Sequence, residues 1–150
     1  MAITTNAIAN SFKKQILEAT HNFKSSGGNS FKLAMYTNSA TLGKSTTAYA
    51  ANPGGGSNTE VTSSNYTAGG KALVNSGTSL ATNTAITDFA DLSFQNVSLT
   101  ARGALIYNDT VSGDPAVAVL DFGGDKTASA GTFTIQFPAF TTSAAILRIA

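Results

Sequence analysis

Apolar residues recur at helical spacing in only one part of this chain, its first 28 residues. The steps between them are four, four, three and four, which places them along one stripe of a helix. The stripe consists of Ile8, Phe12, Ile16, Ala19 and Phe23. Asn6 is a suitable N-cap residue, and Gly27-Gly28 is a stop signal. The pattern therefore predicts one helix, near residues 6–24.

After Gly28 the apolar positions alternate with polar or small ones, and this period of two continues to the end of the chain. Phe31, Leu33 and Met35 form one such run, and residues 133–137 form another. Alternation of this kind is typical of a strand that buries one face and exposes the other. The bulk of the chain is therefore expected to form strands.

Two segments, residues 104–107 and 116–122, are apolar at odd and even positions alike, so both faces of each strand would be apolar, as in strands covered on both sides. The turn-forming residues NDTVSGDP lie between them, so residues 103–122 are predicted to form a hairpin. The apolar phase slips by one residue between Phe94 and Val97, which predicts a β-bulge. Further strands are expected near residues 59–63, 71–75, 84–90, 92–100 and 145–149.

Many short strands separated by clusters of Gly, Asn, Ser and Thr indicate a mainly β protein. We expect an antiparallel β-sandwich or barrel, jelly-roll-like, with one N-terminal α-helix. A chain of 150 residues is long enough for one hydrophobic core. The predicted organisation is a helical arm at residues 1–28 and a β-sandwich domain at residues 29–150, compact as a single domain.

Two short strings resemble phosphate-handling motifs. LGKST at residues 42–46 has the end of a P-loop, but Asn38 stands where the motif needs its first glycine, and no helical pattern follows. Asp121-Phe122-Gly123 has the letters of the magnesium-binding loop of protein kinases, without that fold's other motifs. We interpret the first string as a loop fragment. The second is interpreted as a turn after a buried strand, with Asp121 bonded to turn amides.

Other chemistry has little support in the residues. The chain has no cysteine and one histidine, His21, expected in the last turn of the helix, so neither a zinc site nor a catalytic triad is indicated. Asn108, Asp109 and Asp114 do not have EF-hand spacing, so a solvated turn is favoured over a calcium site. The sequence predicts a protein that is not an enzyme and has no cofactor or metal.

Charge also argues against some partners. The formal net charge is +1; the first 50 residues hold five lysines and one glutamate (+4), and the rest hold four basic and seven acidic residues (−3). These lysines are not interleaved with stacking aromatic residues, so nucleic-acid binding is not expected. No run of eighteen apolar residues and no basic leader with an apolar stretch occurs, so we expect no membrane span and no standard secretion signal.

Several blocks of the chain resemble a family of small β-rich structural proteins of tailed bacteriophages. The blocks lie in the same order as in that family and span residues 31–150, nearly the whole β region. They are KLAMYT at 32–37, YTAGGK at 66–71, LTARGALIYND at 99–109, LDFGGDK at 120–126, GTFTIQFP at 131–138 and the end AAILRIA. The loop AANPGGGSNTE departs from the family pattern.

This resemblance implies a virion component made in the cytoplasm of a bacterial host. The most concrete form is a capsid decoration, or cement, protein on the outer surface of the head. It would bind the major capsid protein and itself, as a homotrimer at local three-fold positions. A tail-associated or host-recognition protein is the alternative, and a free lectin-like protein is a third reading. In both, Tyr36, Tyr49, Tyr66 and Tyr107 would stack on sugars if exposed together, or form core if buried.

Six residues are the candidates for a capsid or subunit interface. The helical arm either packs on its own sheet or reaches a neighbouring subunit, and its lysines would face an acidic capsid surface. Arg102 interrupts an apolar strand pattern, so we expect it to pair with an aspartate within the subunit or across an interface. The candidates are Phe12, Lys13, Lys14, Phe23, Lys24 and Arg102.

Overall fold

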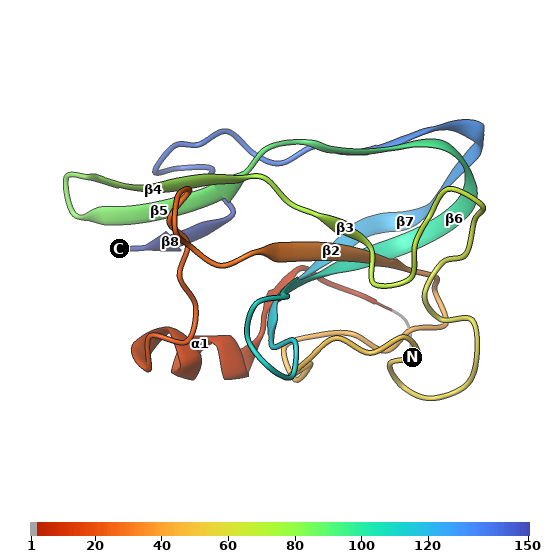
Figure 1. The fold of residues 1–150 in the computed structure, drawn as a ribbon, viewed down its shortest axis with the longest axis horizontal. Coiled ribbons are helices and arrows are strands. Elements are labelled where there is room, and N and C mark those ends of the chain that lie inside the picture. The colour runs from red at the N-terminus through yellow and green to blue at the C-terminus, as the bar shows by residue number, and fades with distance from the viewer. Residues whose placement is uncertain (1–2) are drawn as a thin grey trace.

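The computed structural model describes residues 3–150 as two antiparallel sheets with one short helix (Figure 1). One sheet has five strands in the order β1-β7-β6-β2-β3, and the other has three in the order β4-β5-β8. The strands are β1 (Ala7–Ile8), β2 (Phe31–Tyr36), β3 (Lys71–Ala72), β4 (Asn75–Ala81), β5 (Thr84–Phe89), β6 (Leu92–Asn108), β7 (Ala116–Ile135) and β8 (Leu147–Ile149), and the helix is α1 (Asn10–Leu17). The mainly β fold with an N-terminal helix is as predicted.

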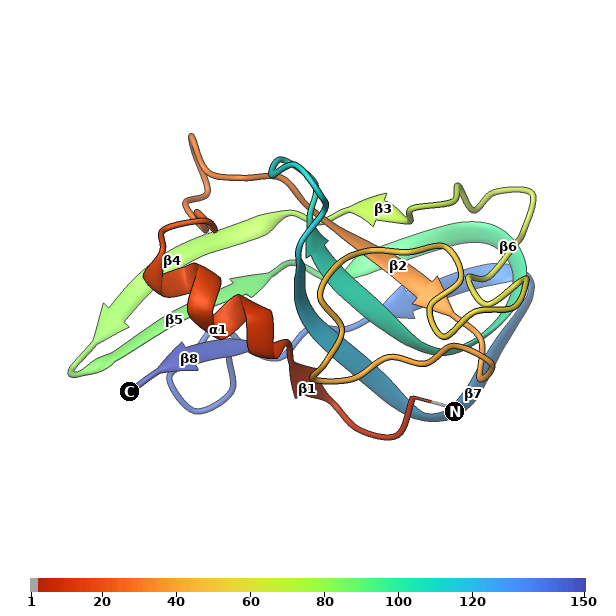
Figure 2. The same ribbon diagram turned by 90° about the horizontal axis from the view of Figure 1, so that it is seen from below.

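The hairpin of β6 and β7 is the framework of the larger sheet. Gly103 pairs with Asp121 and Tyr107 pairs with Ala116, which confirms the hairpin predicted for residues 103–122. Pairing continues far beyond it, to Leu92 opposite Ile135. The hairpin bends strongly, at the right in Figures 1 and 2, so that the two long strands turn back over themselves. A single hairpin therefore supplies both halves of a curved sheet.

Irregular pairing accounts for this bend. The register shifts between Phe94 and Val97, where a bulge was predicted, and Asn96 there has a φ of 52°. A larger shift lies around Gly123. Asp121 pairs with Gly103 and Lys126 pairs with Ala101, so β7 has more residues than β6 between these two pairs. Extra residues on one strand bend it and increase its twist. The DFG string was expected to be a turn after a strand. It is instead an insertion inside β7.

The helix is shorter than predicted at both ends. Ala7 and Ile8 form β1 and pair with β7, because an open sheet edge offers them hydrogen bonds that helix geometry would forgo. The N-cap is Ala9 rather than Asn6, whose side chain accepts a hydrogen bond from the amide of Asp121 instead. At the other end Ala19 has a φ of 57°, which breaks the helix before residues 20–24.

Other strands differ from expectation in part. β5 and β8 lie within the ranges predicted for them, and β3 lies in the range 71–75. Residues 59–63 form only isolated bridges, such as the one between Glu60 and Tyr36. β4 was not predicted, because it has a single large apolar residue, Leu80, and so lacks an alternating pattern.

Five phenylalanines join the arm and both sheets in one core. Phe12 comes from α1, Phe23 from the following segment, Phe31 from β2, Phe89 from β5 and Phe137 from the segment after β7. Phe23 stacks on Phe31 at a centroid distance of 4.4 Å, and Phe31 lies 5.7 Å from Phe89. Because Phe31 and Phe89 belong to different sheets, these contacts hold the two sheets together.

Candidate functional site

Two of the six interface candidates lie in the core of their own subunit. Phe12 and Phe23 are each 7% exposed and belong to the same buried cluster as the sheet residues. Their rings lie 5.9 Å apart in an edge-on arrangement. Of the two arrangements considered for the arm, the structure shows the one in which it packs on its own sheet. These rings are therefore not presented to a partner.

The lysines of the arm, in contrast to its phenylalanines, lie on the surface. Lys13, Lys14 and Lys24 are all exposed. Lys14 forms an ion pair with Glu18 over 3.2 Å, and the side chain of Lys13 donates to Asn10 over 3.4 Å. Exposed pairs of this kind contribute little to stability, so they leave the lysines available to a partner. Their role at an interface stays a prediction.

His21 joins the arm to the end of β6. It is buried, and its Nδ1 lies 3.1 Å from Nδ2 of Asn108 while its Nε2 lies 2.9 Å from Oε1 of Gln15. Because Nδ2 of Asn108 can only donate, Nδ1 accepts and the proton is on Nε2. Burial lowers the pKa of His21, which favours this neutral form. The expected place in the last helical turn was wrong.

The four tyrosines form part of the core rather than a sugar-binding platform. Tyr36, Tyr66 and Tyr107 are buried, and Tyr49 is half-buried and stacks on Tyr107 at 4.8 Å. They hold the long segment between β2 and β3 against the sheet. Tyr36 donates to the carbonyl of Ala50, for example, over 2.8 Å. Burial is the main cause that raises the pKa of each phenol well above its ordinary value.

Glu60 is the centre of this tyrosine cluster. It is 6% exposed, and its Oε1 accepts from the hydroxyl of Tyr66 at 2.8 Å and from the amide of Gly69 at 2.7 Å. Its Oε2 accepts from the hydroxyl of Tyr49 at 2.7 Å. Three donors satisfy the buried carboxylate, which otherwise has a high desolvation cost. Glu60 thus has a structural role that its sequence context did not indicate.

The GKS string forms a closed turn. The amide of Thr46 donates to the carbonyl of Gly43 over 3.0 Å, and the amide of Gly43 donates to the hydroxyl of Thr46 over 3.0 Å. A phosphate loop needs free amides that point at the ligand. The amides of Gly43 and Thr46 are already used, which agrees with the interpretation as a loop fragment.

Asn108 and Asp109, for which a calcium site was disfavoured, already have partners within the chain. Oδ1 of Asn108 accepts from the amides of Thr110 and Val111, at 3.0 and 3.3 Å. The carboxylate of Asp109 pairs with Lys32 over 3.2 Å. These contacts fit a turn rather than a calcium site, but Asn108 is buried and not solvated as expected.

Asp121 organises the insertion in β7. Its carboxylate lies 3.4 Å from Nε of Arg102 and accepts from the amide of Gly123 over 2.9 Å. Asp121 was expected to bond to turn amides, and Gly123 supplies such an amide at a φ of 75°. Arg102 was expected to pair with an aspartate within its subunit or across an interface, and the structure shows the pair within the subunit. Both side chains are mostly buried, with exposed fractions of 27% and 14%.

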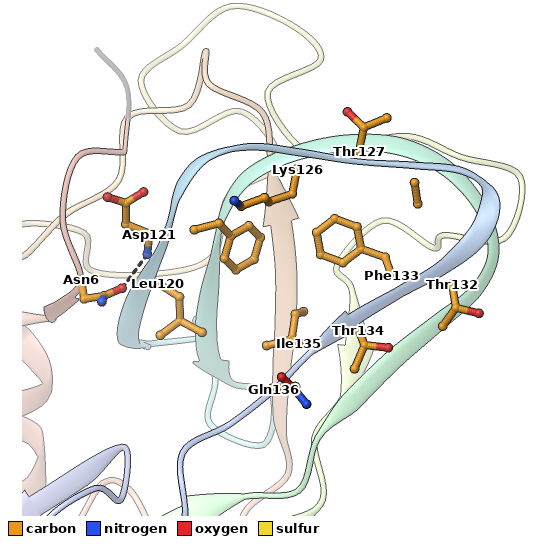
Figure 3. Close-up of a pocket in the computed structure, with 12 residues that line it drawn as sticks. Asn6, Leu120, Asp121, Lys126, Thr127, Thr132, Phe133, Thr134, Ile135 and Gln136 are labelled. Carbon is orange, nitrogen blue, oxygen red and sulfur yellow. Dashed lines mark hydrogen bonds between the residues drawn. The ribbon is translucent and has the colours of Figure 1, made fainter.

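The bend of β7 creates a groove of about 660 Å³ on its concave side. Figure 3 shows the strand curving around the side chains of Leu120, Phe133 and Ile135. Phe122 lies beside Phe133, with 5.8 Å between ring centroids. The lining residues are Asn6, Leu120, Asp121, Phe122, Lys126, Thr127, Ala128, Thr132, Phe133, Thr134, Ile135 and Gln136.

Apolar side chains line the interior of this groove, and polar groups lie at its margin. Thr132 and Thr134 are exposed, and Lys126 is exposed at the other side. A hollow of this kind can accept an apolar side chain or an extended segment while its margin offers hydrogen bonds. Alternation along residues 131–137 predicted half-buried side chains but not a groove, because the groove depends on the bend of β7 between Thr127 and Thr132 (Figure 3).

Within residues 3–150, no three His, Cys, Asp or Glu side chains lie close enough together to bind a metal ion. Over the same residues, no helix has both the length and the apolar character needed to cross a membrane. No protein-family model, no curated protein and no solved structure matches the chain.

Proposed function

We propose that this chain is a structural protein of a tailed-bacteriophage virion, and in particular a decoration protein on the outer surface of the head. Its partner would be the major capsid protein, whose neighbouring copies it would hold together. The role requires binding and no catalysis. A homotrimer at local three-fold positions of the shell is part of the same proposal.

One observation supports this function most. Two of the blocks that resemble the phage family, residues 120–126 and 131–138, supply most of the lining of the groove, and Asn6, Thr127 and Ala128 supply the rest. They lie on either side of the bend in β7, so the fold brings them together on one surface. The residues behind the resemblance therefore form a concave surface for a partner.

The groove suits an extended loop of a capsid protein. Its interior offers the partly buried side chains of Leu120 and Phe122, and burial of such apolar surface contributes about 25 cal/mol per Å². The exposed lysines of the arm would add attraction to an acidic shell, mainly to the rate of association. Attraction of this kind weakens as salt is added, whereas burial in the groove does not.

The alternative of a tail-associated or host-recognition protein has no specific observation in its favour. Its support was the set of four tyrosines, and these are largely used in the core. Sugar stacking by an exposed tyrosine platform is therefore not part of the proposal.

The test uses heads purified without this chain, to which the purified protein is added back. Thr132→Arg places a long charged side chain at the margin of the groove, and Thr62→Arg makes the same change at an exposed position of the segment between β2 and β3. We expect Thr132→Arg to weaken binding to heads by about tenfold or more, a loss of about 1.4 kcal/mol. Thr62→Arg should bind as the natural chain does. Equal binding by both variants would exclude the groove, and no binding by the natural chain would exclude decoration itself.

A further inference from the structure

The edge strand β4 lacks the features that usually prevent edge strands from pairing with other chains. Native edges are commonly protected by charged residues, proline, short length or bulges. Between Lys71 and Asp88 the chain has no charged residue and no proline. A bulge separates Asn75 from Thr78, but Thr78–Ala81 pairs regularly with β5 and is exposed. These four residues form an unprotected edge.

The other open edges of the described strands are different. The outer edge of β7 beyond its contact with β1 carries Asp121, Asp125 and Lys126, and its uncharged part, residues 127–135, is interrupted by two register shifts. The edge of β6 before its pairing with β2 is covered in part by side chains of Ser63 and Asn65, which bond to the amide of Ser98 and the carbonyl of Asn96. β8 carries Arg148, and β1 and β3 have two residues each. A charge on an edge strand discourages pairing, because it would have to be desolvated in the new sheet. Among these edges, β4 is therefore the best suited to pairing.

An exposed apolar row leads to the same edge. Leu80 of β4 pairs with Ala85 of β5, and Ala85 pairs with Ile149 of β8, so the three side chains lie on one face of the sheet. Leu80 is 70% exposed and Ile149 is 62% exposed. The hairpin of β4 and β5 projects beyond the rest of the molecule, as Figures 1 and 2 show. The row therefore ends at an open strand edge.

We propose that β4 pairs in antiparallel fashion with β4 of a second copy of this chain, around a two-fold axis. An uncharged strand does not repel its own copy, and identical edges supply matched backbone donors and acceptors. The two three-stranded sheets become one sheet of six strands, with the apolar rows of both copies on the same face. This inference rests on the edge and does not depend on the proposed function; beside the proposed homotrimer, the two-fold contact would join subunits of two different trimers.

Symmetry restricts the register of this pairing. Residues that face each other across two strands point to the same side of the sheet, and a two-fold axis perpendicular to the sheet preserves that side. The pairing is therefore centred on a residue and not between two residues. With Ser79 at the axis, Thr78 of each copy lies opposite Leu80 of the other, which covers both exposed leucines.

The absence of cysteine from the chain makes a direct test possible. In this register Ser79→Cys places two thiols opposite each other, at a Cα separation of about 4.5–5.5 Å, within the range that a disulfide spans. Ser57→Cys, at an exposed position of another loop, is the control for chance collisions. Under mild oxidation we expect Ser79→Cys to form a covalent dimer of twice 15.3 kDa, about tenfold faster or more than Ser57→Cys.

A second pair of variants tests the edge itself, in the Ser79→Cys chain. Leu80→Lys should reduce the rate of cross-linking to that of Ser57→Cys, because it places a charge on the edge. Leu17→Lys makes the same change at a leucine that is 88% exposed on α1, and it should leave cross-linking unchanged. Equal rates for Ser79→Cys and Ser57→Cys would overturn the proposal. Cross-linking that is insensitive to Leu80→Lys, or a natural chain that sediments as a monomer at every concentration, would also overturn it.

Discussion

The imidazole of His21 accepts a hydrogen bond at Nδ1 from the side-chain amide of Asn108, over 3.1 Å. Asn108 also donates to the side chain of Asn29 over 2.9 Å and accepts from the start of the β6–β7 loop. His21 therefore connects the arm, the start of β2 and the end of β6. A protonated imidazole could not accept this bond, so the arm is held by a group that acid can disrupt.

Stability should decrease on mild acidification because of His21. Burial lowers its pKa in the folded protein from the ordinary 6.5, so the unfolded chain binds the proton first. The contribution is complete above pH 6.5 and is lost as the pH falls toward the folded-state pKa. Urea unfolding between about pH 5 and 8 measures this loss.

The matched variant for this prediction is His21→Phe. It keeps a ring among Phe12, Phe23 and Phe31 but has no titratable group. Asp88, whose pKa burial raises, is present in both chains, so its effect cancels in the difference. The difference in unfolding free energy between the two chains should depend on pH in this window. A constant difference would show that His21 does not titrate there.

Glu60→Gln should destabilise the protein by about 1–3 kcal/mol, because it replaces an acceptor oxygen by a donor group among three buried donors. Glu18→Gln is the control, since Glu18 is exposed and pairs only with Lys14. It should change the unfolding free energy by less than about 0.5 kcal/mol. Equal losses in urea unfolding would mean that the tyrosine cluster does not depend on the Glu60 carboxylate.

Gly70→Ala should destabilise the protein by more than about 3 kcal/mol. Gly70 has a φ of 79°, and a Cβ there would collide with the backbone carbonyl of Leu33. Gly55 has a similar φ of 82° with open space around it, so Gly55→Ala should cost only about 1 kcal/mol of backbone strain. Thermal unfolding of both variants separates the collision from the strain. Similar melting temperatures would contradict the close packing of Gly70 on β2.

Arg102→Leu should destabilise the subunit by about 1–2 kcal/mol, since it leaves the mostly buried carboxylate of Asp121 without its cation. Arg148→Leu is the control, because Arg148 donates only to exposed loop carbonyls. If Arg102 acts only within the subunit, binding to heads should be unchanged once both proteins are folded. Weaker binding by Arg102→Leu alone would return Arg102 to the interface.

The parts of the fold that were predicted correctly depend on local pattern. Apolar residues on both phases, with turn formers between them, indicated the hairpin at 103–122, and the phase slip indicated the bulge after Phe94. The helix was predicted too long because Ile8 and Phe23 continue its spacing by chance. Ile8 instead pairs in β1, and Phe23 reaches the core from a loop.

What could not be predicted depends on contacts between distant residues. The groove requires the bend of β7, and only the pairing of β6 with β7 reveals the register shifts that go with it. The tyrosine cluster requires the fold to bring Glu60 beside Gly69 and Tyr49, and nothing in the sequence near Glu60 indicates a buried carboxylate. The pairing of Arg102 was predicted because a charge in an apolar strand needs a partner, but its partner could not be named.

If this chain decorates the head of a phage, as we propose, it must be abundant in purified particles. Quantitative mass spectrometry of particles gives the ratio of this chain to the major capsid protein. We expect a ratio near one to one, as for a protein that follows the symmetry of the shell. Only a few copies per particle would place the chain in the tail. Its absence from particles would mean that it is not a virion protein.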